Sequence, residues 1–213
     1  MPNSPLFWGT TIVDSKRNKR RIIQAEAFVH SRQSFPSRFG IDHRSEDFLL
    51  LGVERKDIDE SLDSPLVQSL TGRTLLIDCL KEQGIFAENP VYEYGKYGKP
   101  ILANYPGWFF NISHCKDAVV CVLAAREVGV DVESLTSPDM ELMQSVLHDT
   151  EIAGVLRSPE PDRAFTRLWT RKESLLKCLG TGISDHLKYI LHQHTCEFFD
   201  LSGKNYEISL CLM

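Results

Sequence analysis

The sequence predicts an α+β fold made of two similar halves, residues 1–126 and 127–213, each a small antiparallel sheet packed with helices. Three observations support this fold class. Strand-like runs joined by short turns occupy the middle of the chain, two further strand-like runs close it, and helix-like segments precede each group. Short repeats and low-complexity segments are absent from the sequence, which excludes solenoid and coiled-coil folds.

The first half begins with a predicted strand over residues 6–13 and a basic, helix-like stretch over residues 18–30. Residues 32–66 are polar and give no clear prediction. A helix is expected over residues 66–83, because leucine and cysteine recur there at helical spacing, and Gly84 would end it.

The middle of the chain is predicted to form a β-meander of three strands joined by short turns, at residues 108–114, 118–125 and 128–133. The second half is expected to hold a helix starting at Ser137-Pro138, a helix over 150–157, a longer helix up to Leu179, and strands over 195–201 and 205–212. Proline favours the first turn of a helix and glycine ends one, so Pro161 and Gly180 bound the longest helix.

Composition restricts the class of protein. The chain has 213 residues, of which 42% are hydrophobic and 25% charged, as in an ordinary folded protein. A net charge of −5 argues against nucleic-acid binding through an overall positive surface. The six cysteines form no Cys-x-x-Cys pair, and the sequence has neither a signal-peptide pattern nor an apolar run long enough for a membrane span. We therefore expect a soluble, cytoplasmic protein with reduced thiols.

Carboxylates and a lysine recur at spacings that would gather them in one place. Asp131 and Glu133 are two residues apart in a β-branched run, so a strand would present both on one face. Trp169, Glu173 and Lys177 are four residues apart, so a helix would align them in one stripe. Such a set suits Mg²⁺, which prefers a few carboxylates together with substrate phosphates. The alternative for Asp131 and Glu133 is the charged outer face of an edge strand.

Further motifs accompany this set in a fixed order. They are Gly72-Arg73-Thr74-Leu75-Leu76, Gly98-Lys99-Pro100, Phe110-Asn111-Ile112-Ser113-His114, Gly129-Val130-Asp131-Val132-Glu133, Asp149-Thr150-Glu151 and the segment from Trp169 to Lys177. Together they closely resemble the 4′-phosphopantetheinyl transferases of the Sfp type, from Arg73 to about Ile183. Residues 32–66 do not align with the family. Sfp-type chains usually continue beyond the final hairpin, so we expect a smaller second sheet here.

The resemblance implies an enzyme that moves the 4′-phosphopantetheine arm of coenzyme A to a serine of an apo acyl or peptidyl carrier protein, releasing adenosine 3′,5′-bisphosphate. It implies Mg²⁺, or Mn²⁺, held by Asp131, Glu133 and Glu173. The implied catalytic residues are Glu151, Lys172 and Lys177, with both lysines at the pyrophosphate. The implied coenzyme A contacts are Arg73 at the 3′-phosphate, Lys99 and Pro100 at the nucleotide end, and Ser113 and His114.

Several of these residues keep a second interpretation. Glu151 matches the carboxylate proposed to take the serine proton, but it could complete the outer shell of a metal site or simply favour a first helical turn. Arg73 could be a solvent-facing helix arginine, and His114 a histidine satisfied in place.

The doubled length, compared with shorter trimeric relatives, implies a monomer whose active site lies in the cleft between its halves, without nucleic-acid or membrane partners. A non-catalytic protein of the same fold that binds carrier proteins or coenzyme A is the alternative function. A Mg²⁺-dependent nucleotide hydrolase ranks last, because the sequence has no Gly-x-x-x-x-Gly-Lys-Ser/Thr loop.

Overall fold

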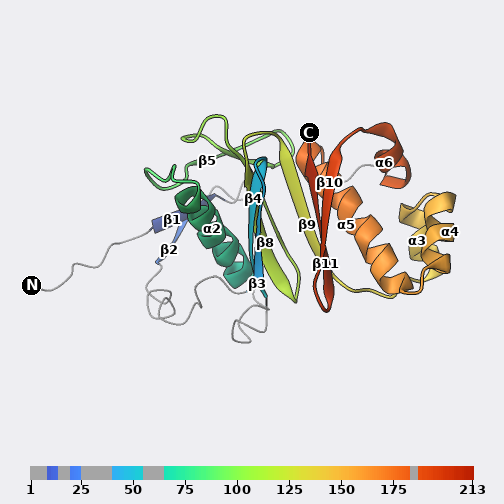
Figure 1. The fold of residues 1–213 in the computed structure, drawn as a ribbon. Coiled ribbons are helices and arrows are strands. Elements are labelled where there is room, and N and C mark those ends of the chain that lie inside the picture. Colours follow the sequence, from blue (N-terminus) through green and yellow to red (C-terminus); the bar gives the residue numbers. More distant parts are fainter. Residues whose placement is uncertain (1–8, 14–19, 25–39, 55–64, 183–186) are drawn as a thin grey trace, which may run out of the picture. The chain divides into compact units, whose positions relative to one another are not determined.

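A computed structural model describes residues 9–13, 20–24, 40–54, 65–182 and 187–213 (Figure 1). The chain divides into two units, residues 1–37 and residues 38–213. In the first unit, β1 (Gly9–Val13) pairs antiparallel with β2 (Arg20–Gln24). The helix predicted over residues 18–30 is therefore wrong for residues 20–24, where two consecutive β-branched isoleucines favour a strand. The rest of that prediction lies outside the described residues.

The second unit contains two antiparallel sheets. One has the strand order β3 (Gly40–Arg44), β4 (Phe48–Glu54), β8 (Ala118–Ala124) and β7 (Phe109–His114). The other has the order β10 (Glu197–Ser202), β11 (Tyr206–Leu212) and β9 (Val128–Ser134). A separate hairpin pairs β5 (Tyr92–Tyr94) with β6 (Pro100–Leu102).

The helices in the described residues are α2 (Pro65–Glu82), α3 (Met140–Val146), α4 (Asp149–Arg157), α5 (Pro161–Leu179) and α6 (Ile190–Gln193), with a 3₁₀ turn, η4, at Leu187–Tyr189. The predicted long helices and the final hairpin are confirmed. The α+β class with small antiparallel sheets is also confirmed, whereas the equivalence of the two halves stays a prediction.

The predicted three-stranded meander is wrong in its last step. Strands β7 and β8 pair as expected, but β9 pairs with β11 and joins the other sheet. Strands β3 and β4 lie within residues 32–66, for which no secondary structure was predicted. Strand β4 is almost fully buried, and a strand covered on both faces reads as a continuous apolar run without alternation.

The two sheets and the two long helices of the second unit form four layers, and α3, α4 and α6 lie beyond α5 (Figure 1). Helix α2 packs on the outer face of the four-stranded sheet, the two sheets pack face to face, and α5 covers the outer face of the three-stranded sheet. Val130 and Val132 of β9 belong to the core between the sheets. Because side chains alternate along a strand, Gly129, Asp131 and Glu133 face α5.

Helix α5 has strong signals at both ends. Pro161 occupies its first turn, Asp162 adds a negative charge there, and Lys177 adds a positive charge in the last turn. Gly180 ends the helix with a left-handed backbone, at a φ of 66°. The predicted boundaries of this helix are confirmed, and they fix which residues face β9.

Candidate active site

Helix α5 lies unusually close to β9 at Gly129. A Cβ atom placed on Gly129 would lie 2.1 Å from the Ser174 carbonyl oxygen and 2.3 Å from the Cys178 backbone nitrogen. Such distances are far below van der Waals contact, so the position requires glycine. This close approach brings the Trp169-Glu173-Lys177 stripe directly against the acidic face of the strand.

The centre of the site is the buried carboxylate of Asp131, which is 2% exposed. Its Oδ1 atom accepts a hydrogen bond from Ser113 Oγ at 2.9 Å and forms an ion pair with Lys177 Nζ at 2.5 Å. Lys177 Nζ also donates to Ser113 Oγ at 2.9 Å. The strand-based and helix-based sequence patterns therefore converge, as predicted, at Asp131 and Lys177.

Glu133 and Glu173 extend the acidic cluster on either side of this pair. Burial, followed by the negative charges of Asp131 and Glu173, raises the pKa of Glu133 to about 7, although Lys177 and a hydrogen bond from Trp169 oppose the shift. Burial and the charge of Asp131 also raise the pKa of Glu173. The negative charges of these carboxylates oppose one another's ionisation, and Lys177 offsets this effect only in part.

Two buried oxygens of this cluster have no hydrogen-bond partner. They are Asp131 Oδ2 and Glu173 Oε1. A buried carboxylate oxygen without a donor costs free energy, so both are available to a cation or a donor from a ligand. Within the described part of the chain, however, no group of three His, Cys, Asp or Glu side chains is gathered closely enough to form a metal site.

A pocket of about 300 Å³ adjoins the cluster. Glu173 and Lys177 line it from α5, Asn111 lines it from β7, Lys99 from the turn before β6, and Pro100 from the first position of β6. This cavity thus contains both residues predicted at the nucleotide end, Lys99 and Pro100. It also contains one predicted metal ligand, Glu173, and one residue predicted at the pyrophosphate, Lys177.

Alternating polar side chains of strand β7 accept hydrogen bonds from the backbone of β9. Asn111 Oδ1 accepts a hydrogen bond from the Val130 backbone N–H at 3.0 Å, and Ser113 Oγ accepts one from Val132 N–H at 3.3 Å. Ser113, predicted to contact coenzyme A, therefore also holds Asp131 and the free edge of β9. Sequence reasoning missed Asn111, although its alternation with Ser113 was visible.

His114 follows Ser113 at the end of β7 and is exposed. Partial desolvation and the nearby Lys177 ammonium lower its pKa. A histidine with a lowered pKa remains neutral at pH 7, and its ring can donate one hydrogen bond to an anionic ligand.

Lys172 and Glu151 form a second polar centre. Lys172 is fully buried, and its Nζ donates to Glu151 Oε2 at 2.7 Å. It also donates to the carbonyl oxygens of Val146, Leu187 and Lys188, at 3.0, 3.1 and 3.1 Å. These contacts tie α3, α4 and η4 to α5.

Glu151 has a further local contact. Its Oε2 accepts from the His148 backbone N–H at 2.8 Å and completes the capping box of α4. None of the hydrogen bonds or ion pairs recorded for Glu151 or Lys172 in the described residues joins them to Asp131, Glu133 or Glu173. A sequence signal for Lys172 existed, because it lies on the apolar stripe of Leu168 and Leu175.

Arg73 lies on α2, with its guanidinium 5.1 Å from the centre of the Tyr92 ring. It is not a lining residue of the pocket beside Lys177. Of the predicted coenzyme A contacts, the structure brings Lys99 and Pro100 into the pocket and leaves Arg73 stacked on the β5–β6 hairpin.

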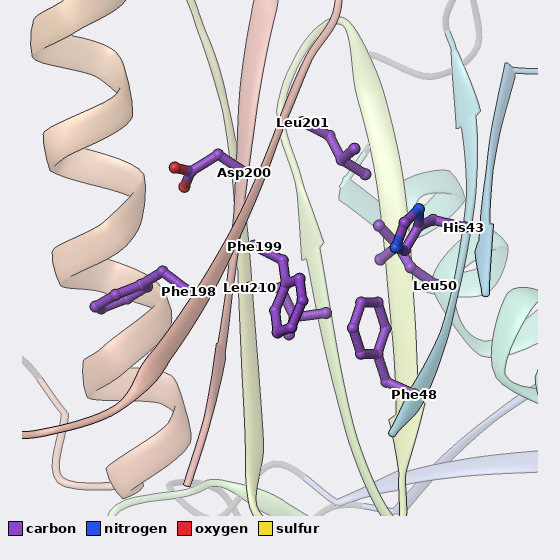
Figure 2. A pocket seen from close by; sticks show the side chains of 8 residues that line it. All are labelled: His43, Phe48, Leu50, Phe198, Phe199, Asp200, Leu201 and Leu210. Carbon is purple, nitrogen blue, oxygen red and sulfur yellow. The ribbon is translucent and has the colours of Figure 1, made fainter. Parts of the chain in front are cut away.

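A second pocket, of about 260 Å³, lies between β10 and strands β3 and β4. Figure 2 shows Phe48, Leu50, Phe199 and Leu210 directed toward it, whereas Asp200 points across β10 toward α5. There Asp200 pairs with Arg171. This pocket is apolar and lacks the carboxylates and lysine of the first, which is therefore the candidate active site.

No helix in the described segments has the length and apolar character needed to cross a bilayer. All six cysteines are free thiols.

Comparison with known proteins gives one family. The model of the 4′-phosphopantetheinyl transferase superfamily matches residues 127–212. This segment contains Asp131, Glu133, Glu151 and the α5 residues Lys172, Glu173 and Lys177. It excludes Arg73, Lys99, Pro100, Ser113 and His114.

Individual relatives agree with the family match. The chain is 30% identical to 4′-phosphopantetheinyl transferase Sfp of Bacillus subtilis over 132 residues, covering 57% of this chain and 59% of that protein. It is 29% identical to 4′-phosphopantetheinyl transferase psf-1 of Bacillus pumilus, covering 81% and 66%, and 36% identical to 4′-phosphopantetheinyl transferase AcpT of Salmonella typhi, covering 52% and 57%.

The matched segments thus cover less than two thirds of each of these relatives. The match to residues 127–212 nevertheless contains the β9 and α5 residues that form the acidic cluster. Over this segment the chain is similar to the 4′-phosphopantetheinyl transferase superfamily, and it is also similar to the transferases Sfp and psf-1.

Proposed function

We propose that this chain transfers the 4′-phosphopantetheine arm of coenzyme A to a serine of an apo acyl or peptidyl carrier protein. The observation that carries the proposal is the Asp131, Glu173 and Lys177 cluster beside a pocket of about 300 Å³, within a segment that matches the superfamily. The names of the relatives describe the same transfer chemistry.

In the proposed reaction, the serine oxygen attacks the phosphorus that carries the pantetheine arm. A new phosphorus–oxygen bond forms, the bond to the bridging oxygen of the pyrophosphate breaks, and adenosine 3′,5′-bisphosphate leaves. The serine proton passes to a base or to solvent. Lys177 would donate to the pyrophosphate and offset the negative charge that accumulates on the leaving group. Neutral His114 would donate to a phosphate oxygen at the rim.

The donor chemistry of the cluster fits a divalent cation. Asp131, Glu133 and Glu173 supply hard carboxylate oxygens, and two of these oxygens are buried without partners. Burial and, after it, the negative charge of Asp131 raise the pKa of both Glu133 and Glu173, and a bound cation would offset this charge. We propose that these three residues hold Mg²⁺, with Mn²⁺ as a substitute. When bound, the ion would neutralise charge on the pyrophosphate oxygens.

The remaining residue roles are also proposals. Arg73 would bind the 3′-phosphate after leaving Tyr92, and Pro100 would stiffen the loop at the nucleotide end. Lys172 would act on the pyrophosphate and Glu151 on the serine proton. To do so, they must first break the ion pair that they form with each other. Their buried pairing favours a supporting role for both.

We further propose that the protein is a cytoplasmic monomer whose halves, 1–126 and 127–213, form the two walls of the active-site cleft. Each sheet carries one long helix on its outer face, α2 or α5, which is consistent with two related halves. Light scattering tests the oligomeric state, and a trimer would require a site shared between subunits.

The alternative is a protein of the same fold that binds coenzyme A or a carrier protein without transferring the arm. Incubation with coenzyme A, Mg²⁺ and a panel of apo acyl and peptidyl carrier proteins separates the two functions. Intact mass should show the added phosphopantetheine on at least one carrier protein. Binding of coenzyme A without a mass increase on any carrier would favour the non-catalytic alternative.

A further inference from the structure

The ammonium group of Lys99 is occupied by protein contacts at the end of α5. Its Nζ forms an ion pair with Glu127 Oε2 at 2.7 Å and donates to the Cys178 carbonyl oxygen at 2.7 Å. A longer contact reaches the Val128 carbonyl oxygen at 3.4 Å. The Lys99 side chain is 16% exposed. The ammonium group of Lys99, which was expected to bind phosphate, is therefore already bound to oxygen atoms of the protein.

The Cys178 carbonyl is among the last four of α5, which lack partners within the helix. A positive charge at a helix C-terminus also interacts favourably with the helix dipole. Lys99, from a different element, therefore caps α5.

The chain around Lys99 is shaped to bring it there. The Lys99 carbonyl accepts from the Gly95 N–H at 2.9 Å, which closes the turn between β5 and β6. On the other side, a Cβ atom at Gly180 would lie 3.0 Å from Lys99 Cδ. Glycine at the end of α5 thus leaves room for the aliphatic part of the lysine.

The capped helix end carries the candidate active-site lysine. Cys178 directly follows Lys177, whose ammonium binds Asp131 and Ser113. Lys99 therefore holds the last turn of α5 from one side, while Lys177 binds β9 and β7 from the other.

From this geometry we infer that Lys99 is a positioning residue. It fastens the β5–β6 hairpin to the C-terminal end of α5 and, by fixing that turn, orients Lys177 toward Asp131. It does not serve as the contact for the 3′-phosphate of coenzyme A. The effect on coenzyme A rests on the proposed function, whereas the effect on the helix end does not.

The first measurement uses the ligand-free protein and does not depend on the proposed function. Amide hydrogen exchange is followed in peptides covering residues 92–102 and 173–182, in wild type and in Lys99→Met. Losing a charge-assisted contact should speed exchange in both peptides by about 10- to 100-fold. Glu127→Gln retains the lysine but removes its countercharge, and it should give a smaller change in the same peptides.

Lys96→Met is the matched control, because Lys96 lies on the same hairpin, is exposed, and stacks on Tyr97. It should leave exchange near 173–182 unchanged. Lys99→Arg retains the charge and should restore part of the protection. If Lys99→Met and Glu127→Gln both exchange like wild type, the inference is wrong.

The second measurement separates positioning from phosphate binding. Calorimetric titration compares coenzyme A with its 3′-dephospho analogue, in wild type and Lys99→Met. If Lys99 only positions the helix end, Lys99→Met should weaken the binding of both ligands by the same factor, because Lys99 makes no contact with the 3′-phosphate. A loss confined to coenzyme A would overturn the inference and return Lys99 to the phosphate. If wild type binds neither ligand, the proposed function fails while the exchange result still decides the capping role.

Discussion

Replacing Glu151 by glutamine distinguishes a general base from one half of a buried ion pair. Glu151→Gln retains the size of the side chain and removes its charge and basicity. In the structure, Lys172 Nζ would keep three carbonyl partners and lose its charged one. Removing one partner of a buried pair typically costs about 3 to 5 kcal/mol in the free energy of unfolding. We expect the lower end, because the glutamine oxygen can still accept one hydrogen bond.

A loss of this size is large against the total stability of a typical domain, about 5 to 15 kcal/mol. Urea unfolding followed by circular dichroism measures it. Asp149→Asn, in the same helical turn and exposed, is the matched control and should change stability by at most about 0.5 kcal/mol. The double variant Glu151→Leu/Lys172→Met should be more stable than Glu151→Gln, since it leaves no buried charge unpaired.

A base role predicts a different pattern. Turnover would then fall by about 10² to 10⁴ with normal stability and normal coenzyme A affinity. If Glu151→Gln unfolds at the same urea concentration as wild type, the buried-pair account of Glu151 fails.

Two further predictions concern β9. Gly129→Ala should push α5 away from the strand and lower the free energy of unfolding in urea by about 1 to 3 kcal/mol or more. Gly154→Ala on α4 is the control, because an added Cβ there meets nothing within 4 Å, and it should be neutral or stabilising by about 0.4 to 1 kcal/mol. Equal effects of the two substitutions would contradict the close approach of α5 to β9. With chelator present, Glu133 has a pKa of about 7 in the folded state against an ordinary 4.5. The folded state therefore binds more protons than the unfolded state, and stability should decline as the pH rises from about 4.5 to about 8. Glu133→Gln should remove this part of the decline. If the melting temperatures of wild type and Glu133→Gln depend on pH in the same way, the raised pKa of Glu133 is refuted.

The sequence predicted the centre of the site because two independent periodicities determine it. Alternation in β9 placed Asp131 and Glu133 opposite the valines, and the four-residue spacing in α5 placed Glu173 and Lys177 on one stripe. Strong boundary signals at Pro161 and Gly180 fixed the register of that helix. Local pattern and tertiary contact agree there, so sequence reasoning succeeds.

Elsewhere the decisive information was not local. Strand β9 follows β8 after only three residues, which favours a hairpin, yet it pairs with β11, some eighty residues later in the chain. The side chains of Asn111 and Ser113 occupy its other edge. A sequence pattern shows that a strand exists, but its partner depends on contacts that are distant along the chain.

Charge also misled the interpretation of individual residues. A lysine in a helix is usually solvated, so the burial of Lys172 was not expected from its type. Similarly, the motif around Lys99 suggested phosphate binding, while the contacts with Glu127 and Cys178 depend on how the hairpin meets α5.

The central claim is that the cluster of Asp131, Glu133, Glu173 and Lys177 performs the transfer with a divalent cation. The most direct measurement is the intact mass of an apo carrier protein after incubation with this protein and coenzyme A, with Mg²⁺ or with excess chelator. We predict complete conversion to the holo form with Mg²⁺ and none in chelator, and Glu173→Gln should lose conversion even with Mg²⁺. Conversion at the full rate in chelator, or by Glu173→Gln, would contradict the account.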